Sequence, residues 1–165
     1  MTMRGFTLIE IMIAVSIMTI LSIVGLTSFN FSMMKSRDSQ RKSDLSLLAK
    51  AVHQFANDFG DFPTDNGTGG ILGCNSADGG ELVVCNYPNQ FAVYVNGAQE
   101  IYLSKTPADP NGSYHYYYRK NTDGFSLFSI LENTNDANYN TDAGPGILCG
   151  VSENCNYELT ESGNK

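Results

Sequence analysis

Residues 4–26 read Arg-Gly-Phe-Thr-Leu-Ile-Glu-Ile-Met-Ile-Ala-Val-Ser-Ile-Met-Thr-Ile-Leu-Ser-Ile-Val-Gly-Leu. The apolar part of this stretch is long enough to cross a bilayer as a helix, which takes about 20 residues. It carries one carboxylate, Glu10, and an acidic side chain inside a membrane span costs a few kcal/mol unless a partner meets it. No basic residue lies between Phe6 and Met34, so the helix itself offers Glu10 no cation. The nearest source of positive charge is a new α-amino group on another copy of the chain, made by cleavage between Gly5 and Phe6.

Two other interpretations of this segment stay open. A secretory signal peptide has an apolar region of about 7 to 15 residues followed by a small-x-small cleavage pattern. The apolar run here is longer and shows no Ala-x-Ala pattern. An ordinary single-span membrane anchor accounts for the length of the run, but it leaves Glu10 without a partner.

The sequence Gly5-Phe6-Thr7-Leu8-Ile9-Glu10, with the apolar run behind it, resembles the processing site of type IV pilins and of the pseudopilins of type II secretion. The resemblance implies that a prepilin peptidase, a membrane-embedded aspartic peptidase, cuts after Gly5 and methylates the new N-terminal Phe6. It also implies that Glu10 pairs with the amino terminus of a neighbouring subunit. Residues 1–5 are then a leader peptide, and the chain itself is expected not to be an enzyme.

A second helical pattern continues the first. No proline occurs from Phe6 to Asp61, and beyond the apolar half one stripe of apolar residues recurs at spacings of three and four: Leu45, Leu48, Val52, Phe55 and Phe59. This pattern predicts one long helix over roughly residues 6–58, ended by Gly60 and Pro63. We expect residues 6–30 to form the transmembrane half of the helix, which becomes the filament core. Residues 31–165 are expected to form a periplasmic or extracellular head that includes the amphipathic half.

Four short runs rich in β-branched and aromatic residues predict strands in the head: 91–95, 101–104, 114–119 and 125–131. Residues 61–88, rich in Gly, Asn, Asp and Ser, are expected to be a connecting loop. The predicted fold class is α+β, with a long N-terminal helix packed against a small antiparallel sheet of three or four strands. The resemblance to pseudopilins and related pilins extends to residues 55–63, at the end of the helix, and to the Asp-Pro-x-Gly turn at residues 109–112.

Charge is divided unevenly along the chain. Residues 1–57 carry six basic and three acidic residues, whereas residues 58–165 carry four basic and fourteen acidic ones, a net charge of −10. An acidic head repels phosphate backbones, so nucleic acid is not expected on its general surface. The basic residues after the apolar run either form a solvated helix face or contact lipid headgroups or an adjacent subunit: Lys35, Arg37, Arg41 and Lys42. Counted alone, they favour a cytoplasmic head.

All four cysteines, Cys74, Cys85, Cys149 and Cys155, lie in the head. An even number in Gly- and Asn-rich surroundings indicates two disulfides in an oxidising compartment, which favours a head outside the cytoplasm. The sequence allows three pairings. We favour the local one, Cys74–Cys85 and Cys149–Cys155, which closes two short loops. Intervals of ten and five residues do not provide the tight spacing of a zinc site.

The segment Glu132–Asp142 is the candidate metal site, because its alternating Asp and Asn oxygens suit calcium. The resemblance points the same way, since major pseudopilins carry a calcium-binding loop after the last sheet strand. Asp136 and Asp142 are the positions to which that role carries over. The segment lacks the Asp-x-x-Gly-Gly pattern of that loop, and a solvated Asn/Asp loop is the alternative interpretation.

The remaining candidates for chemistry have ordinary structural interpretations. Neither His53 nor His115 stands in a recognisable nucleophile motif; we expect His53 beside the helix stripe and His115 on the surface of a strand. Residues 67–70, Gly-Thr-Gly-Gly, lack the lysine of a phosphate-binding loop and are expected to be flexible. The tyrosines of residues 114–118 are expected mainly in the core.

The sequence thus predicts a subunit of a type IV pilus-like filament, held in the cytoplasmic membrane by a single span before assembly. The expected partners are further copies of the chain, the prepilin peptidase and an inner-membrane assembly platform. The final location is then a cell-surface filament or a periplasmic pseudopilus. Two alternatives stay open: a type II secretion pseudopilin, and a membrane-anchored binding domain that never polymerises.

Overall fold

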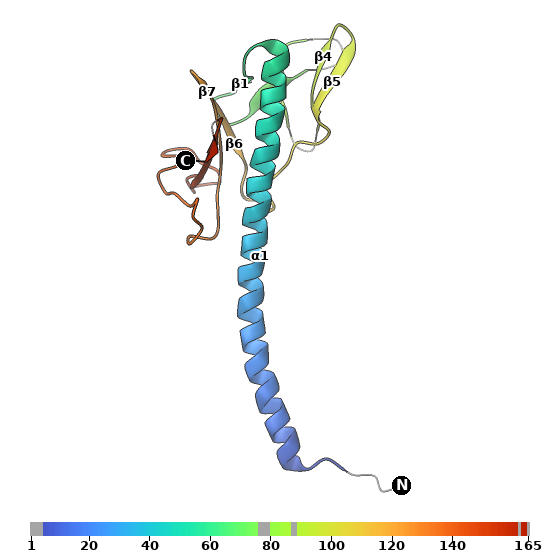
Figure 1. Cartoon of the computed structure of the whole chain (residues 1–165), viewed down its shortest axis with the longest axis vertical. Helices are drawn as coiled ribbons and strands as arrows, with labels where there is room; N and C mark the ends of the chain where they lie inside the picture. Colours follow the sequence, from blue (N-terminus) through green and yellow to red (C-terminus); the bar gives the residue numbers. More distant parts are fainter. Residues whose placement is uncertain (1–4, 76–79, 87–88, 162, 165) are drawn as a thin grey trace. The chain divides into compact units, whose positions relative to one another are not determined.

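The structure is a computed structural model that describes residues 5–75, 80–86, 89–161 and 163–164. It forms two compact units, Met1–Ser36 and Arg37–Lys165. One helix and nine strands follow one another along the described residues (Figure 1): α1 (Leu8–Phe59), β1 (Thr64–Asp65), β2 (Ile71–Cys74), β3 (Val83–Val84), β4 (Phe91–Val95), β5 (Ala98–Leu103), β6 (Tyr117–Asn121), β7 (Gly124–Ser129), β8 (Tyr157–Thr160) and β9 (Gly163–Asn164).

Helix α1 contributes to both units, and the predicted long helix is confirmed, with its ends at Leu8 and Phe59. It ends at Gly60, whose φ of 78° lies in the left-handed region that glycine adopts without strain. The Gly60 N–H donates to the Ala56 carbonyl at 2.8 Å, which satisfies one of the last free carbonyls of the helix. The α+β prediction is likewise confirmed.

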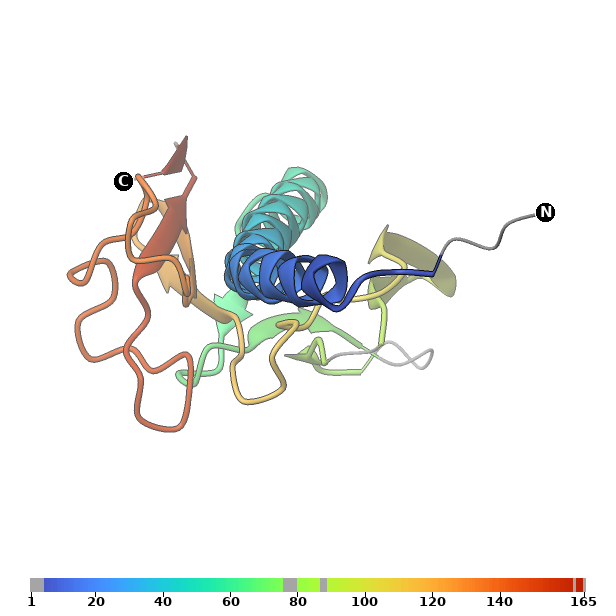
Figure 2. The same ribbon diagram turned by 90° about the horizontal axis from the view of Figure 1, so that it is seen from below.

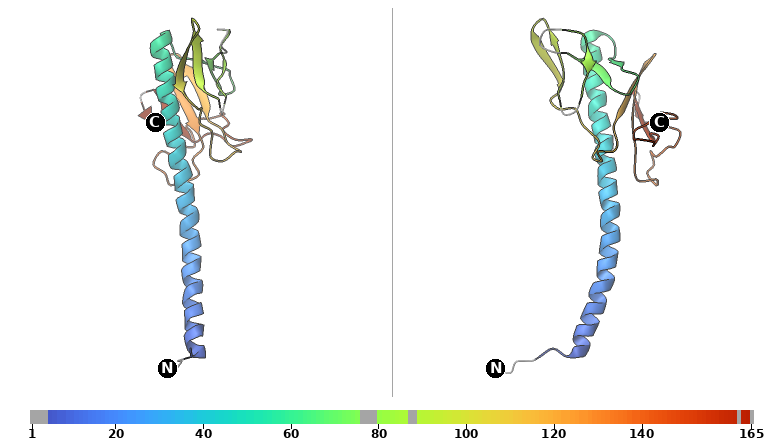
Figure 3. Two further views of the ribbon diagram at one scale, coloured as in Figure 1. Left: turned by 90° about the vertical axis from the view of Figure 1, so that its right-hand side faces the viewer. Right: turned by 180° about the vertical axis from the view of Figure 1, so that it is seen from behind.

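The strands of the second unit form three antiparallel sheets rather than the one that we predicted. Their orders are β1-β2-β3, β4-β5 and β6-β7-β8-β9. Viewed along α1, the β4–β5 hairpin and the four-stranded sheet lie on opposite sides of the C-terminal half of the helix, with β1–β3 between them (Figure 2). In the left view of Figure 3 most strands lie on one side of that half. Residues of its other face are exposed: Ser43, Leu47, Lys50 and Gln54.

The expectation of a structureless loop over residues 61–88 was wrong, because its glycines permit close packing. A side chain at Gly69 would begin 2.5 Å from the Tyr117 ring, and one at Gly73 would begin 2.8 Å from the Phe91 ring. The Gly69 carbonyl also accepts a hydrogen bond from the Tyr118 N–H at 2.9 Å. Glycines of this segment therefore serve close packing of a small sheet, and residues 67–70 form the connection between β1 and β2.

Two strand boundaries differ from the prediction for local reasons. Strand β5 begins at Ala98, because Asn96 and Gly97, with φ of 52° and 82°, form a tight turn directly after β4. Strand β6 begins only at Tyr117, and before it the His115 N–H donates to the Cys149 carbonyl at 2.8 Å. Strand β8 was not predicted, although its four residues, Tyr-Glu-Leu-Thr, alternate apolar and polar side chains.

The core of the second unit forms on the helix stripe. Leu45, Leu48, Val52 and Phe55 are buried, as their spacing predicts. Phe59, the last member of the stripe, is 44 % exposed and stacks on Phe55 with ring centroids 4.5 Å apart. Strands β4, β6 and β7 supply most of the partners of this stripe: Phe91, Val93, Tyr118, Phe125 and Leu127.

Candidate functional site

The N-terminal apolar segment presents its side chains outward. All residues from Gly5 to Ile23 are exposed, and Phe6 and Leu8 reach 84 % and 78 %. Within the described residues, α1 is the one helix that is long and apolar enough to span a membrane, with a mean hydropathy of 2.4 over its most apolar window. Apolar surface of this extent requires lipid or other protein chains around it.

Thr7 and Glu10 form a reciprocal cap at the start of α1. The backbone N–H and the hydroxyl of Thr7 donate to Oε2 of Glu10 at 2.8 and 2.7 Å, and the Glu10 N–H donates to Oγ1 of Thr7 at 3.3 Å. This is the capping box, in which a carboxylate satisfies a free donor at the helix N-terminus. Oε1 of Glu10 accepts no hydrogen bond from a described residue, so half of the carboxylate stays open to an outside partner.

The proposed cleavage junction lies directly before this cap. Gly5 and Phe6 are exposed and precede the first helical residue, Leu8. A side chain placed on Gly5 would meet nothing within 4 Å, so the chain itself leaves this position open. Residues 1–4 of the predicted leader lie outside the described residues.

A buried ionic cluster joins residues 38–41 of α1 to two loops of the second unit. We call Asp38, Arg41, Asp109 and Glu132 the Arg41 cluster. The Arg41 side chain is 0 % exposed, and its Nε and Nη2 donate to the two oxygens of Asp109 at 2.8 and 2.9 Å. Nη1 donates to Asp38 Oδ1 at 2.8 Å, and Nη2 also lies 2.8 Å from Glu132 Oε1. A buried guanidinium is tolerated only with such complete pairing.

The carboxylates of the Arg41 cluster also organise the backbone around them. Asp38 accepts the N–H groups of Glu132 and Asn133 at 2.9 and 2.8 Å. Asp109 accepts the Asn111 N–H at 2.8 Å, which closes the Asp-Pro-x-Gly turn. The cluster therefore attaches both the turn at residues 109–112 and the start of the 132–142 segment to α1.

Electrostatics in and beside the cluster follow from this pairing. Burial alone would lower the pKa of Arg41, but its hydrogen bonds to Asp109, Glu132 and Asp38 raise it instead. The guanidinium of Arg37, which also pairs with Glu132, holds the pKa of Glu132 below its ordinary value. Burial raises the pKa of the neighbouring Asp44, whose Oδ2 accepts the Tyr116 hydroxyl at 2.7 Å.

These contacts correct our interpretation of the basic stretch. Arg41 is neither solvated nor free to contact lipid or another subunit, because its charge is neutralised inside the head. Arg37 pairs with Glu132, and the Lys42 ammonium lies 2.6 Å from Asp136. Lys35, by contrast, is exposed. Three of the four cations thus bind the acidic half of their own chain.

The predicted calcium ligands lie in different surroundings. Asp136 is half-buried and binds Lys42 through Oδ1, which also accepts the Asn138 N–H at 2.9 Å. Asp142 is exposed. Among the residues that the structure describes, no group of three or more His, Cys, Asp or Glu side chains is arranged to hold a metal ion. Since Lys42 already supplies a positive charge at Asp136, a cation bound there must displace it, and the calcium site stays a prediction.

The cysteines pair locally, as Cys74–Cys85 and Cys149–Cys155. The first bond joins β2 to the residue that follows β3. The second is completely buried and packs with Phe128, Ile130 and Ile147 in a small core of its own. Each bond therefore secures a part of the head that short strands alone hold weakly.

The two histidines lie in different surroundings. His53 lies beside the helix stripe, with its ring 5.7 Å from that of Phe62 and 5.2 Å from that of Phe125. His115 is exposed, and it precedes β6 instead of lying in a strand. Its backbone N–H donates to the Cys149 carbonyl at 2.8 Å.

Sequence reasoning missed both polar arrangements described above. The Thr-x-x-Glu spacing at residues 7–10 was a readable signal of the capping box. Asp38 and Arg41, three residues apart on one helix, were a weaker signal of an ion pair. Nothing in the sequence marked Asp109 and Glu132 as their partners, since they lie 68 and 91 residues beyond Arg41.

Comparison with known proteins yields one match. Residues 1–26 match the family model described as the prokaryotic N-terminal methylation motif. No curated protein and no solved structure matches the chain. The chain therefore carries the N-terminal signal motif of type IV pilins and pseudopilins, on a long helix packed with small antiparallel sheets in a pilin-like arrangement.

Proposed function

We propose that this protein is a structural subunit of a type IV pilus-like filament. A prepilin peptidase cuts it between Gly5 and Phe6 and methylates the new N-terminus, and the N-terminal helix then drives assembly. The observation that carries this proposal is the methylation motif at residues 1–26, which overlaps the start of α1. The first sixteen residues of this helix are all exposed, and Glu10 is the one charged residue among them.

Assembly reuses the apolar surface of this helix. In the membrane, lipid chains cover the residues from Phe6 onward; in a filament, the helices of other subunits take the place of the lipid. The same side chains therefore serve as an anchor before assembly and as the filament core afterwards.

The open oxygen of Glu10 supports a role in subunit pairing. Both Thr7 contacts go to Oε2, so Oε1 can receive the amino group of a neighbouring Phe6 without breaking the cap. Such a pair neutralises a carboxylate that is costly in an apolar environment. The cap therefore holds the carboxylate in place for its partner.

Two disulfides and an acidic surface suit a head that is exported from the cytoplasm. We assign the assembled subunit to a cell-surface filament and the unassembled one to the cytoplasmic membrane. A periplasmic pseudopilus of type II secretion is the second candidate, favoured by the Asp-Pro-x-Gly turn that Asp109 closes. The inner-membrane assembly platform and the peptidase are the partners in both.

The test is to shear filaments from cells that express the protein and to measure the mass and N-terminal sequence of their subunit. We expect the chain to begin at N-methylated Phe6. Gly5→Leu should remain uncut in the membrane and be missing from filaments. Subunits that retain residues 1–5 in filaments, or a cut chain found only as a membrane-anchored monomer, would contradict the proposal.

A further inference from the structure

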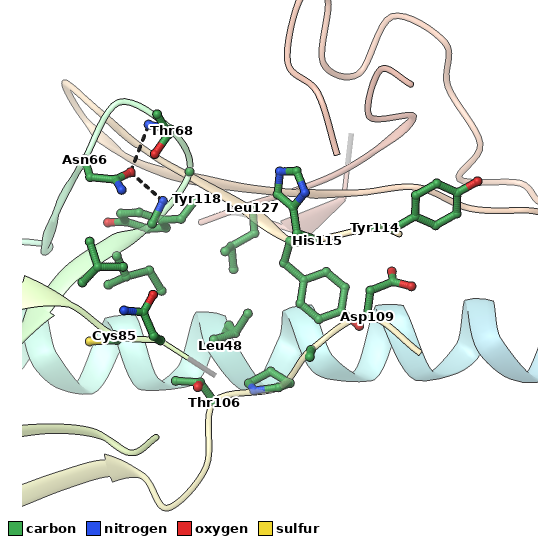
Figure 4. A pocket seen from close by; sticks show the side chains of 18 residues that line it. Leu48, Asn66, Thr68, Cys85, Thr106, Asp109, Tyr114, His115, Tyr118 and Leu127 are labelled. Carbon is green, nitrogen blue, oxygen red and sulfur yellow. Dashed lines mark hydrogen bonds between the residues drawn. The ribbon is translucent and has the colours of Figure 1, made fainter. Parts of the chain in front are cut away.

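A cavity of about 340 Å³ opens on the second unit, between α1 and the strands that pack on it (Figure 4). Leu48 of α1 and Leu127 of β7 line its middle, Asn66 and Thr68 lie at one end of the view, and Asp109 at the other. Cavities of this size hold small ligands, with an apolar floor and a few polar groups for orientation.

The cavity offers a ligand no free charge. Among the described residues that line it there is no lysine or arginine, and Asp109 is the only carboxylate. Both oxygens of Asp109 are already bound by Arg41. The hydroxyl of Tyr116 donates to Asp44, and that of Thr106 to the Asn89 carbonyl at 3.0 Å. A charged ligand would therefore enter without a counterion, at a desolvation cost that nothing here offsets.

Several neutral polar groups on the rim remain available. Oδ1 of Asn66 accepts the N–H groups of Thr68 and Gly70 at 3.0 and 2.8 Å, which fixes the amide and leaves its NH₂ group free within the described chain. The Thr68 hydroxyl and the His115 ring likewise make no hydrogen bond to a described residue. All three side chains are exposed. The rim thus combines fixed hydrogen-bonding groups with water access.

The floor is apolar and partly aromatic. Leu48 and Leu127 are almost completely buried, at 5 % and 0 % exposure, and the rings of Tyr116 and Tyr118 complete the lining. Rings favour ligands that present a flat C–H or π face. A suitable ligand is therefore neutral, with one apolar face and a border of hydroxyl or amide groups.

Two other classes of ligand fit the site less well. Nucleic acids and anionic sugars are repelled by a head with a net charge of −10, four basic residues against fourteen acidic ones. A peptide cannot add a strand to β2, because β2 is already paired on one side with β1 and on the other with β3.

We propose that this cavity binds a neutral sugar ring, with its C–H face toward Leu48 and Tyr116 and its hydroxyls toward Asn66, Thr68 and His115. Sugar binding is a further function that does not depend on filament formation. It can be measured on the unassembled subunit, so its failure and a failure to polymerise are separate results.

The experiment is saturation-transfer NMR on the full chain in a sugar-free detergent. The probes are methyl glycosides of glucose, galactose, mannose and N-acetylglucosamine, with N-acetylneuraminic acid as the anionic comparison and trialanine as the peptide comparison. We expect millimolar binding of at least one neutral glycoside and no binding of the other two. Thr68→Val and His115→Phe should each weaken binding about two- to tenfold, as expected for one lost hydrogen bond.

Two further variants make the result decisive. Ala108→Phe fills the cavity from its lining and should abolish binding, whereas Thr134→Val, a matched change at an exposed threonine outside the cavity, should leave it unchanged. Near-ultraviolet circular dichroism checks that each variant is folded. The proposal is overturned by a lack of binding to every neutral glycoside, by equal binding to all the folded variants, or by a preference for trialanine or the acidic sugar.

Discussion

Arg41 and Asp109 form a two-point ion pair in which both side chains are 0 % exposed, although 68 residues separate them in the sequence. The pair connects the first turns of α1 within the second unit to the turn that follows the β4–β5 hairpin. Asp38 and Glu132 complete the charge balance around the guanidinium. The strands and loops of the head are thus attached to α1 by apolar packing on the stripe at residues 45–55 and by the ion pairs of the Arg41 cluster.

Removing Arg41 should destabilise the head strongly. Arg41→Met leaves three carboxylates close together without their cation, and the loss of one partner from a buried pair costs about 3–5 kcal/mol of unfolding free energy. Arg41→Lys should cost less, because it keeps the charge but not the two-point geometry. Urea unfolding of the full chain in detergent, followed by tyrosine fluorescence, measures both. Lys50→Met, at an exposed position on the same helix, is the control and should change stability by less than about 0.5 kcal/mol.

The stability of the head should fall with acid through Glu132. Its pKa is lowered in the folded protein from 4.5, mainly by the hydrogen bond from Arg37. A carboxyl with a depressed folded pKa contributes stability that is fully present above the unfolded pKa and is lost as pH falls through the folded pKa. Glu132→Gln should therefore melt below the wild type at about pH 6 and converge with it toward about pH 3. A constant difference in melting temperature across this range would count against the assignment.

Glu10→Gln should insert into the membrane and fold but enter filaments poorly. The amide retains the size of the side chain and can accept hydrogen bonds from Thr7, so the cap survives in part. The charge that meets a neighbouring amine is lost, while insertion becomes easier by a few kcal/mol. The measurement is the ratio of sheared filament to membrane-bound subunit, with Thr7→Val as the comparison that breaks the cap and keeps the charge. Normal filament yield from Glu10→Gln would exclude a pairing role.

The two disulfides should differ in what their removal costs. From loop closure alone, removing either bond should lower the free energy of unfolding by about 2–3 kcal/mol. The loss should be about 0.5 kcal/mol larger for the longer Cys74–Cys85 loop. Cys149 and Cys155 are both 0 % exposed in a small core, so replacing them by alanine also loses packing. We expect the Cys149→Ala/Cys155→Ala variant to be the less stable of the two. Non-reducing peptide mapping is the accompanying check, and a bond between the two loops would refute the pairing.

Calcium binding at Asp136 and Asp142 should be limited by Lys42. The Lys42 ammonium holds Asp136 Oδ1 at 2.6 Å and Asn138 Oδ1 at 3.1 Å, two oxygens that a calcium ion would need. Lys42→Met should therefore show a larger rise in melting temperature at millimolar calcium than the wild type, because only the folded state binds. Asp136→Ala should remove that rise and Lys50→Met should not affect it. An equal response, or none, in Lys42→Met and wild type would reduce the segment to an ordinary surface loop.

The fold was predictable where the signal is local. An uninterrupted helical pattern with a glycine at its end gave α1 to within two residues at either end, since helix formation depends on near neighbours along the chain. The run of β-branched and aromatic residues at 91–95 predicted β4 with both of its ends. The strands β1 to β3 were not predicted, because the glycines in and around them suggested a loop. The reason for such glycines lies in distant residues that pack against them, such as the Phe91 ring against Gly73.

The sequence by itself determined the N-terminal motif and the long apolar helix, because each depends on residues close together along the chain. It favoured the local pairing of the cysteines among three possible ones, and the structure shows that pairing. Only the tertiary structure decided what the charges do. A basic stretch on a helix has the same sequence pattern whether it faces water, lipid or the head of its own chain. Which of these it contacts depends on where folding places Asp109 and Glu132. Burial of Arg41 is favourable only because three carboxylates, spread over residues 38–132, meet at one point.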